Sequence, residues 1–548
     1  MDENQSLHKT LHPDFPFDYL RWIESPAGVA RLPDAAQDAS VAIVGAGLAG
    51  LVAAFELCKI GLRPIVYEAG WIGGRLRTHQ FDGVDSDVVA ELGGMRFPAT
   101  ATLFWHYAQN LLGLERKPFP NPISPAAGCT TVELLGKRYH GKNLSDFPIV
   151  FQDIMTAWMS SLERDGKWKE LKAAWSADNV PLVKAVWNDL VRHWDDRSFY
   201  DFLCNSQDFK NLPYEYKEVF GQIGFGTGGW DSDFQNTMLE IFRVVFSGFD
   251  SDQYLIVGGA QQVTLGLWST PCAVDGSSIK DRNHGSPHGK VKKIYRNPDT
   301  KKLIVENEWG ISEEYSAVLV TCQSWLLTTS IDVEETLFSD RLWMALDRTR
   351  YMQSSKTFVL VDRPFWKSEN GELGSSLAVT LSDRLTRGTY LFDSGPNKPA
   401  VICLTYSWMG DALKVLPLSI EQRTQLSLSA LKKMHPNVCI ERHIKSRPVS
   451  ISWELEENFL GAFKGALPGH YRYNRIMYTH FWQEELPEEE QGIFLAGDDV
   501  SWTPGWAEGA IHTALNAFWG IVRHFGGRCP DENPGPGDVL NDIGPIHL

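Results

Sequence analysis

The sequence predicts an α/β fold, α+β overall, in which a Rossmann-like nucleotide-binding domain is joined to a mixed-sheet domain and carries a helical insertion. Three patterns predict it: a strand, glycine turn and helix near residue 41, short β-branched runs beyond residue 290, and helical spacing of Trp and Leu between them. At about 150 residues per domain, a chain of 548 residues has room for three or four folding units.

Composition restricts the partners of this chain. The net charge is −16, from 52 Lys and Arg against 68 Asp and Glu. An acidic chain is a poor partner for nucleic acid or anionic lipid, because both reward basic patches. With 43% hydrophobic and 22% charged residues, the composition is that of a globular protein and excludes disordered, collagen-like and coiled-coil classes. Small molecules are therefore the favoured ligands.

Cysteine usage and the N-terminus indicate a compartment. The eight cysteines are scattered, with no C-x-x-C pair and no Cys/His cluster at zinc spacing, so we expect no metal. The opening MDENQSLHKT lacks the apolar core of a signal peptide, which together with the cysteines predicts a cytoplasmic protein. The apolar stretch from Val41 to Leu57 is interrupted by glycines and followed by Lys59, so we expect no membrane span.

The N-terminal part predicts an arm followed by a nucleotide-binding unit. Residues 1–40 are Pro-rich and are expected to form an extended arm on the globule. Val41–Val44 is a β-branched run, LVAAFELCKIG is typical of a helix closed by Gly61, and Pro64–Glu68 is a second apolar run. This order predicts a parallel βαβ unit, the first part of the nucleotide-binding domain, over residues 41–102.

The rest of the chain divides into four segments. Residues 103–249 have Trp, Leu and charges at helical spacing and predict a helical insertion within the substrate domain. Residues 250–331 predict a strand meander and a buried strand at Val318–Thr321, the second nucleotide-binding part. Residues 332–485 alternate strands with a helix and predict the substrate-binding domain. Residues 486–548 predict a strand, a loop and a long helix, the third nucleotide-binding part with a C-terminal tail.

The segment GAGLAG, residues 45–50, matches G-x-G-x-x-G directly after a strand and at the start of a helix. Gly45 makes the tight turn, Gly47 allows the backbone to approach a pyrophosphate, and Gly50 packs helix against strand. Glu68 ends the next strand, where an acid accepts hydrogen bonds from ribose hydroxyls. The helix N-terminus faces the phosphates. This context predicts dinucleotide binding.

Two further stretches favour FAD over a nicotinamide cofactor. Gly73, Gly74 and Arg75 offer backbone N–H groups and a guanidinium for a diphosphate. Near the C-terminus, Gly497 and Asp498 end a strand just before a helix. A nicotinamide enzyme needs neither feature, whereas FAD has a ribityl chain that requires its own hydrogen-bond partners. The alternative for Asp498 is a plain helix N-cap.

Motifs from both ends of the chain resemble one family. VAIVGAGLAGLVAA, GGRLRT, ELGGMRFP, SSK before a strand, and AGDD followed by GWAEGAIHTALNA occur in the order found in flavin-dependent amine oxidases of the L-amino-acid oxidase and monooxygenase branch. The resemblance extends from Val41 to Gly527 and is strongest to the bacterial L-lysine 2-monooxygenases, through GGMRFP, FGTGGWDSDF, DRLTRGTYLFD and LGAFKGALPGHYRYN. One departure is the stretch AGWI after Glu68, which lacks the basic residue common in the wider family.

This resemblance implies a cofactor and its ligands. FAD is expected to be noncovalent, because no cysteine lies near Asp498 at the position that some relatives use for covalent attachment. The expected partners are an amino acid, O₂ and a second copy of the chain in a homodimer. Beyond the glycines and Glu68, the implied cofactor-binding residues are Ala49, Gly74, Arg75, Met95, Arg96, Val291, Gly497, Asp498, Trp506 and Ala507.

Three polar residues are candidates for the reacting end. Arg96, in GGMRFP, offers an always-charged bidentate grip for a substrate carboxylate, and the resemblance assigns it that role; a structural salt bridge is the alternative. Tyr406 resembles the tyrosine that gives the carboxylate a second hydrogen bond. Lys356 resembles the catalytic lysine that holds a water near flavin N5, where O₂ reacts, and its alternative is a solvated strand-edge lysine.

The side-chain pocket is implied by the resemblance alone. Trp453 and Trp506 correspond to aromatic walls, and Trp506 also opens the last helix, whose N-terminus faces the flavin pyrimidine carbonyl. Asp233 matches an acid of the lysine enzymes that would pair with a substrate ammonium, although it also suits a loop or N-cap acid. Phe249, expected at the substrate, is larger than its counterpart in those enzymes.

These features predict FAD-dependent oxidation of a cationic L-amino acid, L-lysine above all. Hydride transfer gives the imino acid, and O₂ is the second substrate. If peroxide attacks a retained imino acid, decarboxylation gives 5-aminovaleramide, CO₂ and water, whereas an imino acid that escapes hydrolyses to the keto acid with ammonia and H₂O₂. The alternatives are an L-arginine 2-monooxygenase or a broad-range L-amino-acid oxidase, and, from other classes, a nicotinamide dehydrogenase or a non-catalytic flavoprotein.

Overall fold

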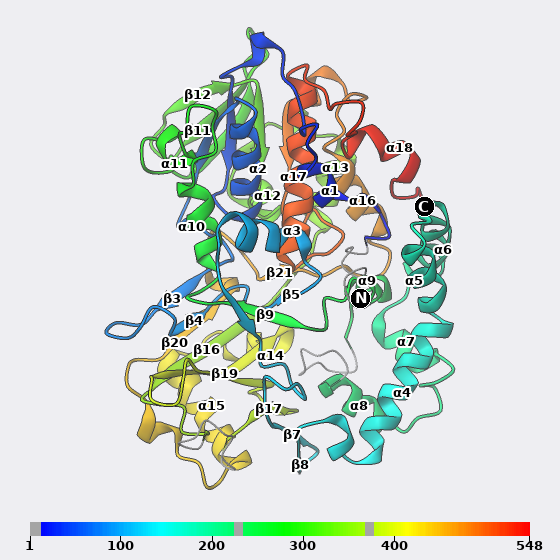
Figure 1. Cartoon of the computed structure of the whole chain (residues 1–548), viewed down its shortest axis with the longest axis vertical. Helices are drawn as coiled ribbons and strands as arrows, with labels where there is room; N and C mark the ends of the chain where they lie inside the picture. Colours follow the sequence, from blue (N-terminus) through cyan, green and yellow to red (C-terminus); the bar gives the residue numbers. More distant parts are fainter. Residues whose placement is uncertain (1–11, 224–233, 368–376) are drawn as a thin grey trace.

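The computed structural model describes residues 12–223, 234–367 and 377–548. A nucleotide-binding part with α2 and α17 lies at the top of Figure 1, a large sheet with α15 lies below it, and the helices α4 to α7 lie at the right. Asp233 falls outside the described residues. Within the described part, no helix is long and apolar enough to cross a membrane.

The nucleotide-binding sheet assembles strands from three separate parts of the chain. Its order is β2-β1-β13-β22, and every neighbouring pair is parallel. The predicted βαβ unit is present as β1 (Ser40–Val44), α2 (Leu48–Lys59) and β2 (Arg63–Tyr67). β13 (Ala317–Val320) and β22 (Ile493–Leu495) come from the second and third predicted parts. An α/β nucleotide-binding fold is therefore confirmed.

Close packing at the first turn explains its glycines. Gly45 has a φ of +116°, a conformation that L side chains rarely adopt. A Cβ at Gly50 would lie 2.1 Å from the Gly45 carbonyl oxygen, so only glycine lets α2 start this close to β1. Behind the turn, α2 packs against α17 (Ala507–His524), and both helices are buried over most of their length.

A second sheet, of order β12-β11-β10-β14, extends the nucleotide-binding part. The predicted meander forms β10 (Val291–Arg296), β11 (Leu303–Asn307) and β12 (Ser312–Tyr315), with antiparallel pairing. β14 (Asp332–Val333) pairs in parallel with β10. Between the two sheets, Val291, Ile294 and Val305 belong to one apolar cluster with residues of β1 and β2.

The large sheet has the order β20-β16-β19-β18-β17-β7-β8. Its strands are β16 (Ser354–Val361), β19 (Ala400–Trp408), β20 (Val449–Ser452), β18 (Gly388–Phe392), β17 (Val379–Ser382), β7 (Thr130–Leu134) and β8 (Lys137–Gly141). Leu428 and Leu431 of α15 (Ile420–Met434) belong to an apolar cluster with Val359 of β16. β7 and β8 lie inside the segment expected to be helical. Sequence periodicity missed them because β7 is held by parallel pairing with the distant β17.

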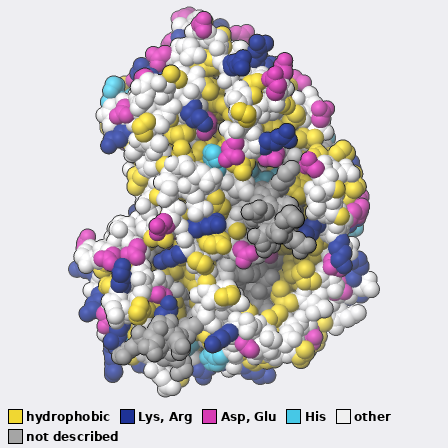
Figure 2. All heavy atoms as spheres, viewed as in Figure 1, with side chains coloured by type: hydrophobic (Ala, Val, Ile, Leu, Met, Phe, Trp, Pro, Cys, Tyr) yellow, Lys and Arg dark blue, Asp and Glu magenta, His cyan; other side chains and the backbone are white. Residues whose placement is uncertain are grey.

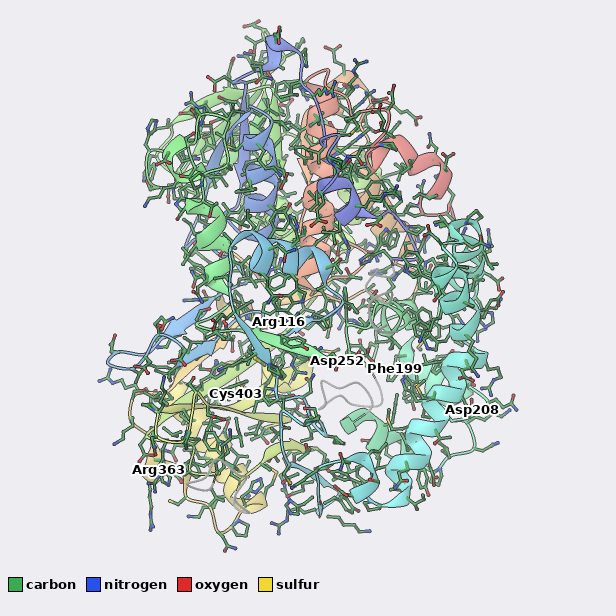
Figure 3. All side chains as sticks on the ribbon, viewed as in Figure 1. Arg116, Phe199, Asp208, Asp252, Arg363 and Cys403 are labelled. Carbon is green, nitrogen blue, oxygen red and sulfur yellow. The ribbon has the colours of Figure 1, made fainter. Side chains whose placement is uncertain are left out.

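The remainder of that segment is mainly helical, as expected, apart from the short strand β6 (Arg116–Pro118). Figure 3 shows Phe199 and Asp208 on this helical side, away from Cys403 in the large sheet. The helices are α4 (Ile149–Arg164), α5 (Trp168–Ser176), α6 (Val180–Trp194), α7 (Phe199–Asn205), α8 (Tyr214–Ile223) and α9 (Met238–Phe246). Elsewhere the main connecting helices are α3 (Thr102–Trp105), α10 (Gln261–Ser269), α11 (Ile279–Arg282), α12 (Trp325–Thr329), α13 (Asp340–Arg348), α14 (Met409–Val415), α16 (Tyr471–Thr479) and α18 (Leu540–Ile543).

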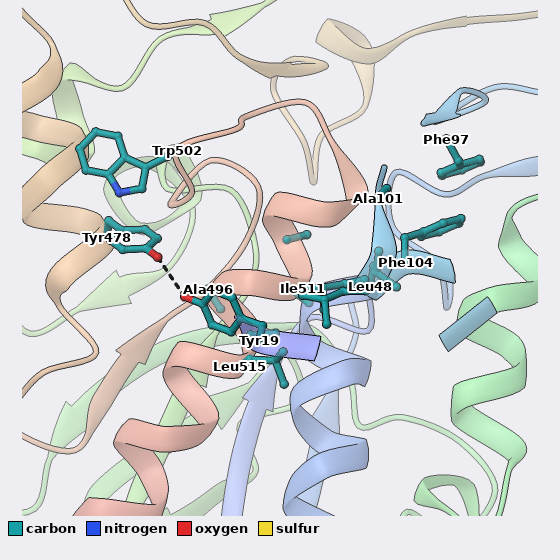
Figure 4. Packing of buried hydrophobic residues seen from close by; sticks show 14 of the residues in the cluster. Tyr19, Leu48, Phe97, Ala101, Phe104, Tyr478, Ala496, Trp502, Ile511 and Leu515 are labelled. Carbon is teal, nitrogen blue, oxygen red and sulfur yellow. Dashed lines mark hydrogen bonds between the residues drawn. The ribbon is translucent and has the colours of Figure 1, made fainter. Parts of the chain in front are cut away.

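The first described residues of the N-terminal arm are packed into the core, beyond the surface contact that the sequence predicts, whereas many of residues 24–39 are exposed. Tyr19 begins α1 (Tyr19–Ile23), is buried, and lies beside α17 with its hydroxyl 3.0 Å from that of Tyr478 (Figure 4). The buried Asp14 carboxylate accepts hydrogen bonds from Arg243 Nε at 2.6 Å and Trp187 Nε1 at 2.8 Å. A buried charge needs such partners, so this pair fixes the arm to α6 and α9.

The molecular surface carries both signs of charge. Over the described residues of the face in Figure 2, basic and acidic side chains are interspersed, with apolar side chains between them. Such a surface differs from the basic stripe that tracks a nucleic-acid backbone.

Candidate active site

A cavity of about 320 Å³ lies where the parallel sheet meets the large sheet. All four parallel strands contribute to it at or just after their carboxyl ends, through Val44, Glu68, Thr321 and Gly497. In open α/β sheets this edge is where ligands bind. The opposite wall comes from β16, β19 and the loop that follows β20.

The glycine turn forms a cradle at one end of the cavity. Gly47, the N-cap of α2, lines the cavity, and no heavy atom lies within 4 Å of the point where a Cβ would stand. The N–H groups at the start of α2 have no partners within the helix. A pyrophosphate fits this open space beside a helix N-terminus, so these residues suit a dinucleotide.

Glu68 is positioned by backbone hydrogen bonds at the end of β2. Its Oε2 accepts from Ala46 N at 2.8 Å and its Oε1 from Gly70 N at 2.7 Å. Burial raises the pKa of this carboxyl, and the backbone N–H bonds oppose that shift. The backbone N–H groups hold the carboxylate at the end of the strand, where an acid accepts hydrogen bonds from ribose hydroxyls.

Arg75 and Asp498 form an ion pair across the cavity wall. Arg75 Nη1 donates to Asp498 Oδ2 at 3.2 Å and to the Ala462 carbonyl at 3.1 Å, and Nη2 contacts Oδ1. Asp498 Oδ2 also accepts from Gly505 N at 2.9 Å. The N-cap of α17 is Trp506, so the N-cap alternative for Asp498 is wrong. The pair joins the first and last nucleotide-binding parts at one point.

The predicted cofactor residues come together, with one exception. Gly50 faces the strand and does not line the cavity, in keeping with its packing role. The others line it: Gly45, Gly47, Ala49, Glu68, Gly74, Arg75, Met95, Arg96, Val291, Gly497, Asp498, Trp506 and Ala507.

Arg96 stands at the other end of the cavity inside a cage of aromatic rings. It directly precedes β5 (Phe97–Pro98). Its Cζ lies 4.4 Å from the ring centre of Phe119 and 4.8 Å from that of Tyr390. Its Nη1 donates to Asn121 Oδ1 at 3.4 Å. A guanidinium held against π faces in the cavity wall is placed to pair with a planar carboxylate, which suits the predicted role.

Lys356 lies on β16 and is fully enclosed. Its Nζ donates to the backbone carbonyls of Glu91 at 3.1 Å and Gly93 at 2.5 Å, which fixes the strand to the loop that carries Arg96. Burial lowers the pKa of Lys356 to about 8. The alternative of a solvated edge lysine is wrong, because only 3% of the residue is exposed and β16 pairs on both sides.

The predicted aromatic residues divide into two groups. Tyr406, Trp453 and Trp506 line the cavity, and Trp453 Nε1 donates to the Leu92 carbonyl at 3.2 Å. Phe249 does not line it: this ring is fully buried behind Trp506, with 5.1 Å between ring centres. The prediction that Phe249 contacts the substrate is therefore wrong; Phe249 packs against Trp506, which lines the cavity.

Two carboxylates in the cavity wall were missed by sequence reasoning. Glu240 of α9 accepts from Asn236 Nδ2 at 2.8 Å and Ala466 N at 2.6 Å. Asp250 lines the cavity with no hydrogen bond or ion pair to the side chain of another described residue, and burial raises its pKa to about 7. Asp250 lies in a loop, where hydrophobic periodicity gives no indication of a functional residue. Its position next to Phe249, a predicted substrate contact, was the one sequence feature that pointed to it.

A glycine cradle at the carboxyl ends of parallel strands is the arrangement of dinucleotide-binding proteins. The chain belongs to the flavin containing amine oxidoreductase family, which matches residues 48–518. The predicted family is thus confirmed, and with it an enzyme that uses a flavin.

Known relatives and structures agree with this family. The chain is 29% identical to a tryptophan 2-monooxygenase of Pseudomonas savastanoi, over 95% of this chain and 96% of that protein. It is 24% identical to an L-amino-acid oxidase of Siganus canaliculatus, over 88% of this chain and 85% of that protein. Putrescine oxidase bound to putrescine, at 18% identity and a TM-score of 0.62, covers 89% of this chain and 99% of its own. Cyclohexylamine oxidase from Brevibacterium oxydans is 16% identical with a TM-score of 0.61, over 89% of this chain and 100% of its own. Both structures share the fold of this chain.

Proposed function

We propose that this enzyme binds FAD noncovalently and oxidises a cationic L-amino acid with O₂, with L-lysine as the substrate. The monooxygenase reaction converts L-lysine and O₂ into 5-aminovaleramide, CO₂ and H₂O. The reaction type is supported by the relatives that are named as monooxygenases and an oxidase of amino acids. The observation that supports a cationic substrate is the Asp250 carboxylate in the cavity wall.

When bound, FAD supplies the acceptor for the hydride equivalent that leaves the substrate Cα. The protein holds the substrate in the orientation that this transfer requires. Arg96 binds the α-carboxylate bidentately, and Tyr406 on the neighbouring wall adds a hydrogen bond. Trp453 and Trp506 enclose the Cα and exclude water.

Asp250 serves the other end of the substrate. Asp250 is half-buried, and a carboxylate removed from water without a cationic neighbour is costly; a substrate ammonium lowers that cost by pairing with it. Glu240 is already satisfied by two hydrogen bonds and adds negative potential. Phe234, the residue after Asp233, lines the same cavity, and we keep Asp233 as a further candidate for the ammonium.

Lys356 serves the O₂ step. Its ammonium lies in a water-poor site, where a positive charge stabilises negative charge that develops on O₂. If the imino acid stays in the cavity, the H₂O₂ formed from O₂ attacks it, and oxidative decarboxylation yields the amide, CO₂ and water. If it leaves, water hydrolyses it to the keto acid and ammonia, and H₂O₂ is released. Retention of the imino acid depends on Arg96 binding its carboxylate and Asp250 binding its side-chain ammonium.

An aromatic amino acid is the second candidate, and the relatives favour it. Seven tryptophan 2-monooxygenases match at 26% to 29% identity. Phe234, Trp408 and Trp453 in the cavity wall would accommodate an indole. L-Arginine is the alternative among cationic substrates.

We also propose that the enzyme is cytoplasmic and forms a homodimer. Gel filtration with light scattering tests the homodimer.

A panel of L-amino acids distinguishes these functions, with O₂ uptake, H₂O₂ and the amide product measured together in the absence of catalase. The proposal predicts the highest kcat/KM for L-lysine and H₂O₂ well below the O₂ consumed. Equal H₂O₂ and O₂ would identify an oxidase, and a preference for L-tryptophan would contradict the proposed substrate.

A further inference from the structure

Three buried metal-ligating side chains meet away from the large cavity. His12 comes from the N-terminal arm, and Glu508 and His512 stand one turn apart on α17. One potential ligand atom from each lies within 4.8 Å of the others. Their exposed fractions are 8%, 1% and 6%, so the cluster is sealed from bulk solvent.

One imidazole of the cluster has an unsatisfied nitrogen. His12 Nε2 is buried and has no hydrogen-bond partner among the described residues. A neutral imidazole has one ring nitrogen with a free lone pair, which is the atom that binds a metal. The His12 and His512 rings pack edge to face, with 3.9 Å between ring centres. Packing explains their burial but leaves the polar Nε2 atom of His12 unsatisfied.

Glu508 supplies the negative charge. Its two oxygens accept from Leu103 N at 3.0 Å and Phe104 N at 2.8 Å, which orients the carboxylate and leaves one lone pair on each oxygen. Its Oε1 lies 3.8 Å from His512 Nε2. Only 1% of Glu508 is exposed, and a divalent cation would stabilise a carboxylate that is buried in this way.

We propose that His12, Glu508 and His512 bind a Zn²⁺ ion. Two neutral imidazoles and a carboxylate are a donor set that Zn²⁺ uses, with metal–ligand bonds of about 2.0–2.2 Å and donor atoms about 3.3 Å apart in a tetrahedron. The separations here exceed that spacing by about 1.5 Å or less, which side-chain rotation closes. The predicted absence of metal rested on sequence spacing, which could not show that the arm brings His12 to α17.

The fourth coordination position has space. His12 and His512 both line a second cavity of about 590 Å³, between the arm and the helical segment, which can hold a water ligand. On the same helix, Ala507 and Ala510 line the dinucleotide cavity. The metal would therefore clamp the arm to the helix that faces the flavin, a structural role that does not depend on the identity of the substrate.

Metal content tests the site directly. Protein prepared without a histidine tag is dialysed against chelator, titrated with Zn²⁺, passed through gel filtration and analysed for zinc and FAD. We expect about one Zn²⁺ per chain for wild type, and loss of that ion in H12A and H512A with FAD retained. H106A is the matched control, since His106 pairs with Glu24 at the surface and should leave zinc unchanged.

A second readout guards against misfolding. Co²⁺ in place of Zn²⁺ should give visible d–d bands beyond the flavin absorption in wild type and in H106A, and none in H12A. If H512A does not fold, H12A and H12Q decide, because they alter only the arm. Wild type that takes up no zinc, or H12A that binds zinc as wild type does, overturns the proposal.

Discussion

Lys356 and Tyr406 are directly paired residues on the antiparallel strands β16 and β19, and Lys356 Nζ lies 4.8 Å from the centre of the Tyr406 ring. The pairing places an ammonium and a phenol side by side in the wall of one cavity. It also carries the ammonium to the carbonyls of the Arg96 loop. The β16–β19 pair thus places Lys356, proposed to act on O₂, close to Tyr406 and to the loop of Arg96, which are proposed to bind the substrate carboxylate.

Replacing Lys356 by Met should slow the reaction of the reduced enzyme with O₂ about 100-fold or more, because a preorganised charge is lost. Reduction by substrate should change much less. Since the pKa of Lys356 is about 8, the ammonium is present below that pH, and the wild-type rate with O₂ should fall as pH rises through 8. Stopped-flow mixing of reduced enzyme with O₂ measures both.

The matched control is Lys117→Met. Lys117 is also partly buried with a lowered pKa, but it lies outside the active-site cavity. A K356M enzyme that reacts with O₂ as fast as K117M would show that Lys356 only fixes the loop.

Replacing Arg96 by Lys should raise KM for the amino acid about 100-fold, or about 3 kcal/mol, because a bidentate pair becomes a single contact. Steady-state kinetics with the best substrate measures this. Arg116→Lys is the control: Arg116 also stacks on aromatic rings, those of Trp105 and Tyr254, but does not line the cavity. Equal KM values for the two variants would exclude Arg96 as the carboxylate ligand.

Replacing Asp250 by Asn should lower kcat/KM for L-lysine about 30-fold or more and affect apolar amino acids little, since a neutral amide cannot pair with an ammonium. The pKa of Asp250 is raised to about 7, so the carboxylate is ionised above that pH. Wild-type kcat/KM for lysine should therefore rise from pH 6 to pH 8, and D250N should lack this rise.

Asp252→Asn provides the comparison for D250N. Asp252 is two residues away, lies outside the cavity, and has a φ of +42° that Asn tolerates. Should D252N lose lysine activity to the same degree, loop stability rather than charge pairing would explain the effect.

Replacing Gly47 by Ala should reduce bound FAD several-fold, because the added methyl would occupy space left for the pyrophosphate. The A280-normalised flavin absorbance after gel filtration measures this. Gly410→Ala is matched, as its Cβ also meets no atom within 4 Å and its φ is not positive. Full FAD content in G47A would place the pyrophosphate elsewhere.

The parts predicted well are those set by local pattern. The β1-α2-β2 unit follows from two short apolar runs and from three glycines, whose spacing is dictated by contacts within a few residues. The strands β16 and β19 were readable from their apolar runs. Motif resemblance then brought Arg96, Lys356 and Tyr406 to one site, and the cavity contains all three.

The parts missed depend on distant contacts. β7 joins the large sheet only by pairing with β17, so its own sequence did not distinguish it from the helices that follow. Asp250 and His12 acquire their character from burial by other segments, which no spacing reveals. Asp498 was predicted near the flavin, but its pairing with Arg75 required knowing how the two ends of the chain meet.

The most direct test of the central claim is anaerobic mixing of the purified enzyme with L-lysine, followed by flavin absorbance. The cavity with Arg96 at one end and Asp250 in its wall predicts rapid bleaching of the oxidised flavin by L-lysine, and slower bleaching by L-tryptophan at equal concentration. A flavin that stays oxidised with L-lysine, or a protein that contains no flavin, would contradict it.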